Sequence, residues 1–354
     1  MDASQALLKE LCEGFGPPGH ETEIAGMMKK HLRGLGEVTQ DGLGSILCKK
    51  KGTADQPRVL VAGHMDEVGF MVKGITPEGF IKFLPMGGWW GHVVLAQKVR
   101  IRTRKGDVLG VVGSKPPHEL QEEERRKVLE LKDMFIDVGA TSYFDVRKKL
   151  GIRPGDPIVP ESGFDVMANP RLYLAKALDN RVGCGLVVDM LRGLKEARHP
   201  NTVYGVATTM EEVGLRGAQT AVASVKPQVA IAVDVGIAHD TPGSMGDGDE
   251  KLGAGVGILV YDATLIPNVG LRDLAVEICE KQKIPFHLGT VERGGTDAGR
   301  FHVYDTGIPS LVIFIPTRYI HSHATIMDRK DYDAGVRLLV ELAKRLDAKT
   351  VGGL

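Results

Sequence analysis

The fold of this chain is decided by the stretch Tyr204-Gly205-Val206-Ala207-Thr208-Thr209-Met210-Glu211-Glu212-Val213-Gly214, where a mostly apolar, β-branched run ends in two carboxylates and a glycine. A short apolar run of this kind is typical of a buried strand. In open α/β sheets, ligands bind beyond the carboxyl ends of the strands. We therefore expect Glu211 and Glu212 to lie where the chemistry takes place.

Four other apolar runs end in the same way, each leading to an aspartate or a histidine. They are Arg58–Gly63 before His64-Met65-Asp66, Leu172–Leu178 before Asp179, Val229–Val233 before Asp234, and Ser310–Pro316 before Tyr319-Ile320-His321. One polar residue after a strand is usually the chain returning to water, but five such endings form a pattern. Carboxylates and imidazoles without cysteine favour Zn²⁺, Mn²⁺ or Co²⁺ in a hydrolytic site over a structural zinc.

Length and composition limit the classes of protein to consider. A chain of 354 residues predicts two domains, or one domain that carries an insertion. The 45 basic and 45 acidic residues give zero net charge, which argues against nucleic acid or an anionic membrane as the main partner and permits self-association.

The cysteines and the N-terminus point to a reduced compartment. The four cysteines are scattered singly without a Cys-x-x-Cys pair, so we interpret them as reduced core thiols. The first residues lack the basic and apolar regions of a signal peptide, and no apolar run reaches the roughly 18 residues of a membrane helix. We therefore expect a cytoplasmic protein.

The order of patterns along the chain predicts an interrupted α/β domain. Strands alternate with helices over 55–69 and 170–345, which indicates a mostly parallel, helix-covered sheet. Between them lie short β-like runs separated by glycine turns, a pattern typical of a small β-barrel or sandwich. We predict a catalytic domain formed by 1–69 and 166–354, with a β-rich insertion at 70–165.

Two features of the insertion leave alternatives open. The adjacent Trp89 and Trp90 could anchor an interface or belong to the local core. The charged segment 116–127 is either a solvated loop and helix or a segment that reaches a neighbouring subunit.

Six short motifs follow one another in order along the chain. They are Gly63-His64-Met65-Asp66-Glu67-Val68-Gly69-Phe70, Ala177-Leu178-Asp179-Asn180-Arg181-Val182-Gly183, Glu211-Glu212-Val213-Gly214, Ala232-Val233-Asp234, Gly294-Gly295-Thr296-Asp297-Ala298 and Thr317-Arg318-Tyr319-Ile320-His321-Ser322. Together they resemble the motifs of the tetrahedral aminopeptidases, dinuclear zinc exopeptidases that include glutamyl and deblocking aminopeptidases. The resemblance runs nearly end to end.

The resemblance implies a role for each site residue. Asp179 would bridge two metal ions, His64 and Asp234 would complete one shell, and Glu212 and His321 would complete the other. Glu211 would be the general base, and Asp66 would hold His64. Adjacent side chains on a strand point to opposite sides, which suits two roles for two neighbouring glutamates. Three carboxylates between and around two dications would offset their repulsion.

Some implied features lie outside the metal shells. Gly294, Gly295, Thr296 and Asp297 would line the pocket near the substrate N-terminus. The insertion would be a dimerisation domain, and dimers would assemble into a hollow tetrahedral dodecamer. His323 competes with His321 as the ligand because both flank Ser322, and the motif favours His321.

The leading hypothesis is an aminopeptidase that trims short peptides with two divalent ions, Zn²⁺ or else Co²⁺ or Mn²⁺. A second hypothesis is a cellulase-like glycoside hydrolase with paired carboxylates, which needs no metal, so histidines among the strand-end ligands argue against it. A third is a non-catalytic assembly protein with vestigial sites, which the complete set of expected ligands disfavours.

Overall fold

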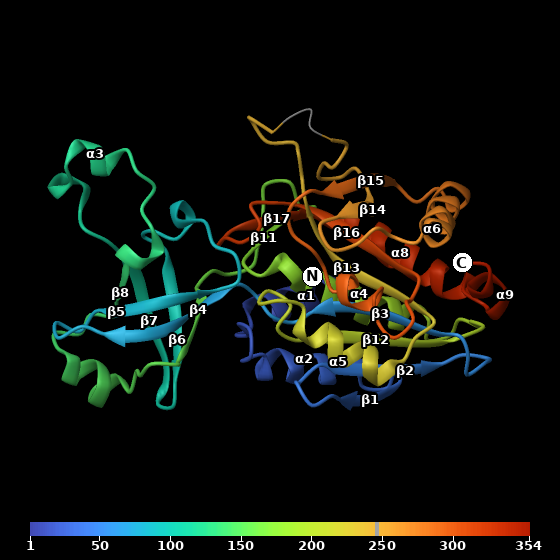
Figure 1. Cartoon of the computed structure of the whole chain (residues 1–354), viewed down its shortest axis with the longest axis horizontal. Helices are drawn as coiled ribbons and strands as arrows, with labels where there is room; N and C mark the ends of the chain where they lie inside the picture. Colours follow the sequence, from blue (N-terminus) through green and yellow to red (C-terminus); the bar gives the residue numbers. More distant parts are fainter. Residues whose placement is uncertain (245–247) are drawn as a thin grey trace.

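The computed structural model describes residues 1–244 and 248–354 and has two parts, a large α/β body and a smaller β-barrel beside it (Figure 1). Eleven of the described strands form one sheet in the body. Nine of them lie in the spatial order β1 (Glu37–Gln40), β2 (Ile46–Lys51), β12 (Thr202–Thr208), β3 (Arg58–His64), β13 (Val229–Ile237), β16 (Ser310–Arg318), β17 (Thr325–Asp328), β11 (Leu172–Ala175) and β10 (Asp165–Val166). The other two are β14 (Val256–Asp262), which pairs with β16, and β15 (Phe286–Val291), which pairs with β14.

The predicted parallel sheet forms the centre of this body. β3 pairs in parallel with β12 and β13, and β13 pairs in parallel with β16. The outer strands add antiparallel pairs on both sides, including β2 with β12 and β16 with β17. Because parallel strands end at the same edge, the carboxyl ends of the four central strands meet there.

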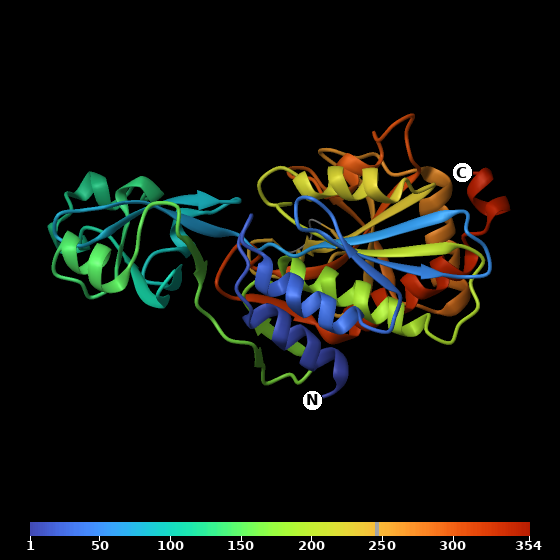
Figure 2. The same cartoon turned by 90° about the horizontal axis from the view of Figure 1, so that it is seen from below.

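Helices cover both faces of the sheet (Figure 2). Their bounds are α1 (Ala3–Glu13), α2 (Thr22–Leu32), α4 (Leu178–Gly193), α5 (Arg216–Val225), α6 (Val269–Gln282), α7 (Ala298–Phe301), α8 (Arg329–Arg345) and α9 (Ala348–Gly352). Val59 and Val61 of β3 pack into the core with α1, α2, α4, α6 and α8, whereas Leu60 and Ala62 pack into the core with α5 and α7. This alternation is the period of two expected for a strand buried on both sides.

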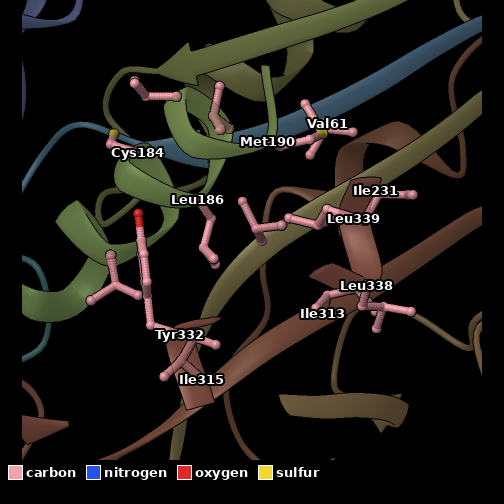
Figure 3. Close-up of a cluster of buried hydrophobic side chains, with 14 of the residues drawn as sticks. Val61, Cys184, Leu186, Met190, Ile231, Ile313, Ile315, Tyr332, Leu338 and Leu339 are labelled. Atoms are coloured by element: carbon pink, nitrogen blue, oxygen red, sulfur yellow. The ribbon is translucent and has the colours of Figure 1, made fainter. Parts of the chain in front are cut away.

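The central helix α4 is packed unusually close to β3. A Cβ atom on Gly63 would lie 2.5 Å from the carbonyl carbon of Gly183, so this contact requires glycine at that position. Figure 3 shows Leu186 and Met190 of α4 in the same apolar cluster as Val61 and residues of α8. The first turn of α4, which begins beside Asp179, is thereby fixed against the end of β3.

The insertion forms a closed barrel, which settles the choice between barrel and sandwich. Its strands follow one another in space in the order β4 (Gly69–Ile75), β5 (Ile81–Met86), β8 (Phe135–Asp137), β7 (Gly106–Gly113), β6 (Lys98–Thr103) and β9 (Pro157–Pro160). The short helix α3 (Glu122–Arg125) and a π-helical turn (Asp145–Leu150) lie in its connections. A separate apolar core fills the barrel, with Phe70, Ile101 and Ile136 fully buried. None of the helices in the described ranges has the length and hydropathy to cross a bilayer.

The two tryptophans take different environments. Trp89 stacks on Phe70 with ring centroids 4.6 Å apart and donates a hydrogen bond from Nε1 to the Gly69 carbonyl at 3.0 Å. Trp90 is 62% exposed. The local-core interpretation therefore holds for Trp89, while Trp90 is available at the surface.

Candidate active site

The strand-end residues converge at one edge of the sheet. His64 ends β3, Glu211 and Glu212 follow β12, and His321 follows β16. Asp234 lies within β13, which continues to Ile237 beyond the predicted end. Asp179 does not follow a strand directly, as was predicted. β11 is antiparallel to its neighbours and ends at Ala175, and Asp179 lies at the start of α4, where its φ of −80° and ψ of 104° are not helical.

These residues form two groups that could each hold a metal ion, and Asp179 belongs to both. One group is His64, Asp179 and Asp234, and the other is Asp179, Glu212 and His321. Asp179 Oδ1 lies 3.3 Å from His64 Nε2, and Asp179 Oδ2 lies 3.2 Å from His321 Nε2. The two oxygens of one carboxylate thus face two separate sets of donors, which is the arrangement a bridging ligand needs.

Burial makes this cluster of acids difficult to ionise. It raises the pKa of Glu212 to about 8, assisted by the negative charge of Asp179, and raises the pKa of Asp234 to about 8. Burial opposes ionisation of Asp179 as well, but hydrogen bonds from His321 and His64 lower its pKa. Two buried carboxylates of raised pKa beside two imidazoles are a donor set that a cation would stabilise in its charged form.

An unpaired ligand atom also fits a cation. Glu212 Oε1 is buried and has no hydrogen-bond partner among the described residues, while Oε2 lies 3.4 Å from His321 Nε2. A buried acceptor without a partner is costly, and coordination of a metal would satisfy it. The residues present therefore fit a pair of divalent ions.

Glu211 stands outside both groups. Its Oε2 lies 3.8 Å from His64 Nε2, and only 9% of the residue is exposed. Burial, together with the charges of Asp234 and Glu212, raises its pKa well above the usual range. A carboxyl tuned in this way accepts a proton more readily near neutral pH than an exposed glutamate does.

Asp66 is bound to the glutamate pair as well as to His64. Its Oδ1 and Oδ2 accept hydrogen bonds from the backbone N–H groups of Glu211 and Glu212, both at 3.0 Å. His64 Nδ1 lies 3.0 Å from the Asp66 backbone carbonyl and 3.5 Å from Asp66 Oδ1. The Asp66 carboxylate therefore lies closer to the backbone N–H groups of the two glutamates than to the His64 ring.

The structure separates the two histidines that flank Ser322. His321 contacts Asp179 and Glu212, whereas His323 Nε2 bonds to the Lys98 carbonyl at 3.0 Å. His321 has a φ of 54°, which turns the chain between the two imidazoles. Of the pair, His321 alone belongs to a group that could hold a metal.

The chain matches the family model described as M42 glutamyl aminopeptidase over residues 44–338. It belongs to the M42 family. The protein is therefore an aminopeptidase, a hydrolase of peptide bonds, and the expected family and enzyme class are confirmed.

Relatives of this M42 chain cover nearly its whole length. It is 38% identical to the putative aminopeptidase FrvX of Escherichia coli over 98% of the chain and 96% of that protein. It is 35% identical to the glutamyl aminopeptidase of Lactococcus lactis, over 92% of the chain and 91% of the relative. It is 33% identical to the lysyl aminopeptidase of Pyrococcus furiosus, over 96% of each chain.

Solved structures agree with this M42 assignment. A TET aminopeptidase from a marine sediment Thaumarchaeota archaeon superposes with a TM-score of 0.96 at 46% identity, covering 100% of this chain and 99% of the other. The TET1 peptidase of Pyrococcus horikoshii, which can assemble into a tetrahedron or a large octahedral shell, gives 0.86 at 30%, over 97% and 100%. A protein named endoglucanase from Thermotoga maritima gives 0.77 at 28%, over 98% of each chain.

The acids and histidines of this M42 protein open into a cavity of about 330 Å³. Gly294, Gly295 and Thr296 line it, together with Arg293 and apolar residues such as Ile237. Asp297 sits behind the wall, where its Oδ2 accepts a hydrogen bond from the Thr208 hydroxyl at 2.5 Å. Burial raises its pKa to about 6.

The barrel of the M42 chain contributes Gly88 to the lining of the same cavity, and Gly87 lies next to Glu212. The backbone of Gly88 hydrogen-bonds to His321, and a Cβ on Gly88 would lie 3.2 Å from His321 Nδ1. A Cβ on Gly87, whose φ is 85°, would lie 3.1 Å from Glu212 Oε2. The φ of Gly87 and a Cβ contact of 2.7 Å with Val68 require glycine there, whereas a side chain on Gly88 would press against His321.

Proposed function

We propose that this protein is a dinuclear metal aminopeptidase that releases N-terminal residues from short peptides. The observation that carries the proposal is the placement of Asp179, whose two carboxylate oxygens face two different groups of possible ligands. In the proposed site Asp179 is shared, His64 and Asp234 hold one ion, and Glu212 and His321 hold the other. Zn²⁺ is the proposed metal, with Co²⁺ and Mn²⁺ as alternatives that accept the same nitrogen and oxygen donors.

The proposed chemistry divides between the ions and the protein. When bound, two divalent ions in these positions supply Lewis acidity, which polarises the peptide carbonyl and lowers the pKa of the attacking water. Glu211 accepts the proton of that water and then gives it to the leaving amine. Its position outside both groups leaves its carboxyl free for proton transfer, and its raised pKa suits the return of the proton.

The substrate end would enter the cavity that the acids share with residues 293–296. A cavity of about 330 Å³ is near the lower end of the range for ligand pockets, so it suits the terminal part of a peptide rather than a folded chain. Gly294 and Gly295 have no side chains to obstruct the peptide, and Thr296 offers a hydroxyl. We assign Asp297 the role of supporting this wall from behind, because it contacts Thr208 and does not line the cavity.

We further propose that residues 70–165 form an inserted dimerisation domain and that dimers build a closed tetrahedral dodecamer. The barrel is enclosed in itself and has its own core, which supports its assignment as a unit separate from 1–69 and 166–354. It also exposes large apolar side chains, among them Trp90, Leu109 and Phe144 at about 60% each. Exposed apolar side chains of this size support a protein interface on the barrel. The TET1 peptidase of Pyrococcus horikoshii can assemble into a tetrahedron or a large octahedral shell, and a related solved structure is a dodecamer.

The glycoside hydrolase alternative has less support. One neighbour is named an endoglucanase, but glycosidase chemistry uses two carboxyls and has no need of imidazoles. Here each group of possible ligands contains a histidine within 3.5 Å of an aspartate oxygen. We therefore retain peptides as the substrate class.

The proposed function is tested by hydrolysis of aminoacyl chromogenic substrates and of unblocked and N-acetylated peptides of the same sequence, with soluble cellulose as a control. The proposal predicts release of the first residue from the unblocked peptides and none from cellulose. Equal cleavage of the acetylated peptide, or activity on cellulose alone, would contradict it. The same panel reveals which N-terminal side chain is preferred.

A further inference from the structure

The turn that carries Glu211 and Glu212 has a strained backbone, which other contacts must stabilise. After β12 ends at Thr208, the chain passes through Met210 with a φ of 54°, a left-handed conformation that L residues with a side chain disfavour. Beyond the glutamates the backbone folds back, and the N–H of Leu215 bonds to the Glu211 carbonyl at 2.8 Å. A strained turn that presents two acids in fixed directions requires partners that favour this one conformation.

Two buried carboxylates supply those partners. Glu21 Oε1 accepts the backbone N–H of Met210 at 3.0 Å, and Asp66 accepts the N–H groups of Glu211 and Glu212. Three consecutive amides of the turn therefore donate to two acids from distant parts of the chain. Hydrogen bonds to a charged acceptor are stronger than those between neutral groups.

Glu21 has no helix-capping role that would explain its burial. It precedes α2, yet within the described ranges its side chain makes no capping bond to that helix. Instead Oε1 also accepts the N–H of Gly19 at 2.9 Å, so the acid joins the turn before α2 to the turn after β12. Only 6% of the residue is exposed, and burial and the nearby charge of Asp66 raise its pKa. A buried acid beside another acid is costly to maintain without a use.

We propose that Glu21 is a positioning residue for the catalytic turn, which holds Met210 in its left-handed conformation and thereby aims the Glu211 carboxyl. This inference rests on the proposed role of Glu211 and adds a residue that no strand-end motif contains. Glu21 is not among the described residues that line the cavity, so it acts through the backbone and not on the substrate.

The test compares three substitutions at Glu21 with one at Glu23. Glu21→Ala removes both hydrogen bonds, and Glu21→Asp keeps the charge but is one methylene too short for the same contacts. Glu21→Gln keeps a carbonyl oxygen that can accept both N–H groups. Glu23→Ala is the matched control, because Glu23 Oε1 likewise accepts a backbone N–H, that of Phe15 at 3.0 Å, but at a different turn.

We expect Glu21→Ala and Glu21→Asp to lower kcat by about 10- to 100-fold, since a misplacement of about 1 Å can cost roughly that factor. KM should change less than about threefold. Glu21→Gln should retain kcat within about threefold, and Glu23→Ala should match the wild type. A kcat within twofold of the wild type in folded Glu21→Ala or Glu21→Asp protein would overturn the proposal.

Amide hydrogen exchange gives a measurement that does not depend on activity. In fragments that cover 208–214, Glu21→Ala or Glu21→Asp should speed exchange by about tenfold or more, and Glu23→Ala should leave it unchanged. Unchanged exchange in the Glu21 variants would overturn the proposal even if kcat fell. If the wild type cleaves no peptide, the proposed function fails, and the exchange comparison still decides whether Glu21 holds this turn.

Discussion

Replacement of Glu211 by glutamine tests the assignment of the general base. Glutamine has nearly the same shape, and the backbone N–H of residue 211 can still bond to Asp66. Because Glu211 belongs to neither group of possible metal ligands, the variant should still bind two ions per subunit. What it loses is the ability to accept a proton.

The size of the effect follows from that loss. A positioned general base contributes about 10²- to 10⁴-fold to the rate. The buried setting of Glu211 and its raised pKa place this carboxyl near the middle of that range. We expect kcat to fall by about 10³-fold, which corresponds to about 4 kcal/mol of activation free energy.

The assay measures kcat and KM on the preferred aminoacyl substrate, with metal content determined on the same sample. Glu212→Gln is the matched comparison, because it changes a proposed ligand on the neighbouring residue and should lower metal content as well as activity. A Glu211→Gln variant that keeps more than a tenth of the wild-type kcat, or one that loses its metal, would refute the assignment.

Three further predictions concern the ligands and their surroundings. His321→Ala should reduce bound metal from two ions to one per subunit, whereas His323→Gln should keep both ions. The measurement is metal content by atomic emission on gel-filtered protein. Equal losses of metal in the two variants would contradict the choice of His321 as the ligand. Gly88→Val should push the His321 imidazole from its position and lower metal affinity at least about tenfold, as measured by calorimetric titration. Gly74→Val is the control and should leave metal affinity unchanged, because this barrel glycine has open space around it. Metal affinity should rise from pH 6 to about pH 9, because protons compete with the ions for three proposed ligands. The pKa values of Glu212 and Asp234 are both raised to about 8, and that of His321 is raised to about 9. A flat profile would contradict this.

The positions of most site residues could be predicted from the sequence because their elements are regular. His64 and Asp234 follow or end β-branched runs that form central parallel strands, and the shared direction of those strands brings them together. The same pattern led to Asp179, but the strand predicted before it is too long. The run Leu172–Leu178 reads as one strand, yet the chain leaves β11 at Ala175 and turns at Ala177 with a φ of 56°. Residue type gives no signal for such a turn at an alanine.

The supporting contacts could not be predicted because they join residues far apart in the chain. Asp66 bonds to the backbone of Glu211, 145 positions away, and Glu21 bonds to Met210, 189 positions away. From the sequence, Asp66 is most simply a partner for His64, and Glu21 is a polar residue at the start of a helix. Backbone N–H groups occur at every non-proline residue, so their acceptors have no sequence signature.

The choice between His321 and His323 shows the same limit. In an extended strand the two would point to the same side, but the left-handed φ of His321 sends them to different neighbours. The family motif favoured the residue that the structure brings to Asp179. Geometry at one residue, which alternation along a strand does not encode, decides the outcome.

The most direct test of the central claim is the dependence of peptidase activity on the number of bound ions. Protein stripped with a chelator and returned to metal-free buffer is titrated with Zn²⁺, and in parallel with Co²⁺ and Mn²⁺, while hydrolysis and bound metal are measured together. The account predicts no activity without metal and a rise that reaches its plateau at two ions per subunit. Full activity in the stripped protein, or a plateau at one ion with the second leaving the rate unchanged, would contradict a dinuclear site shared through Asp179.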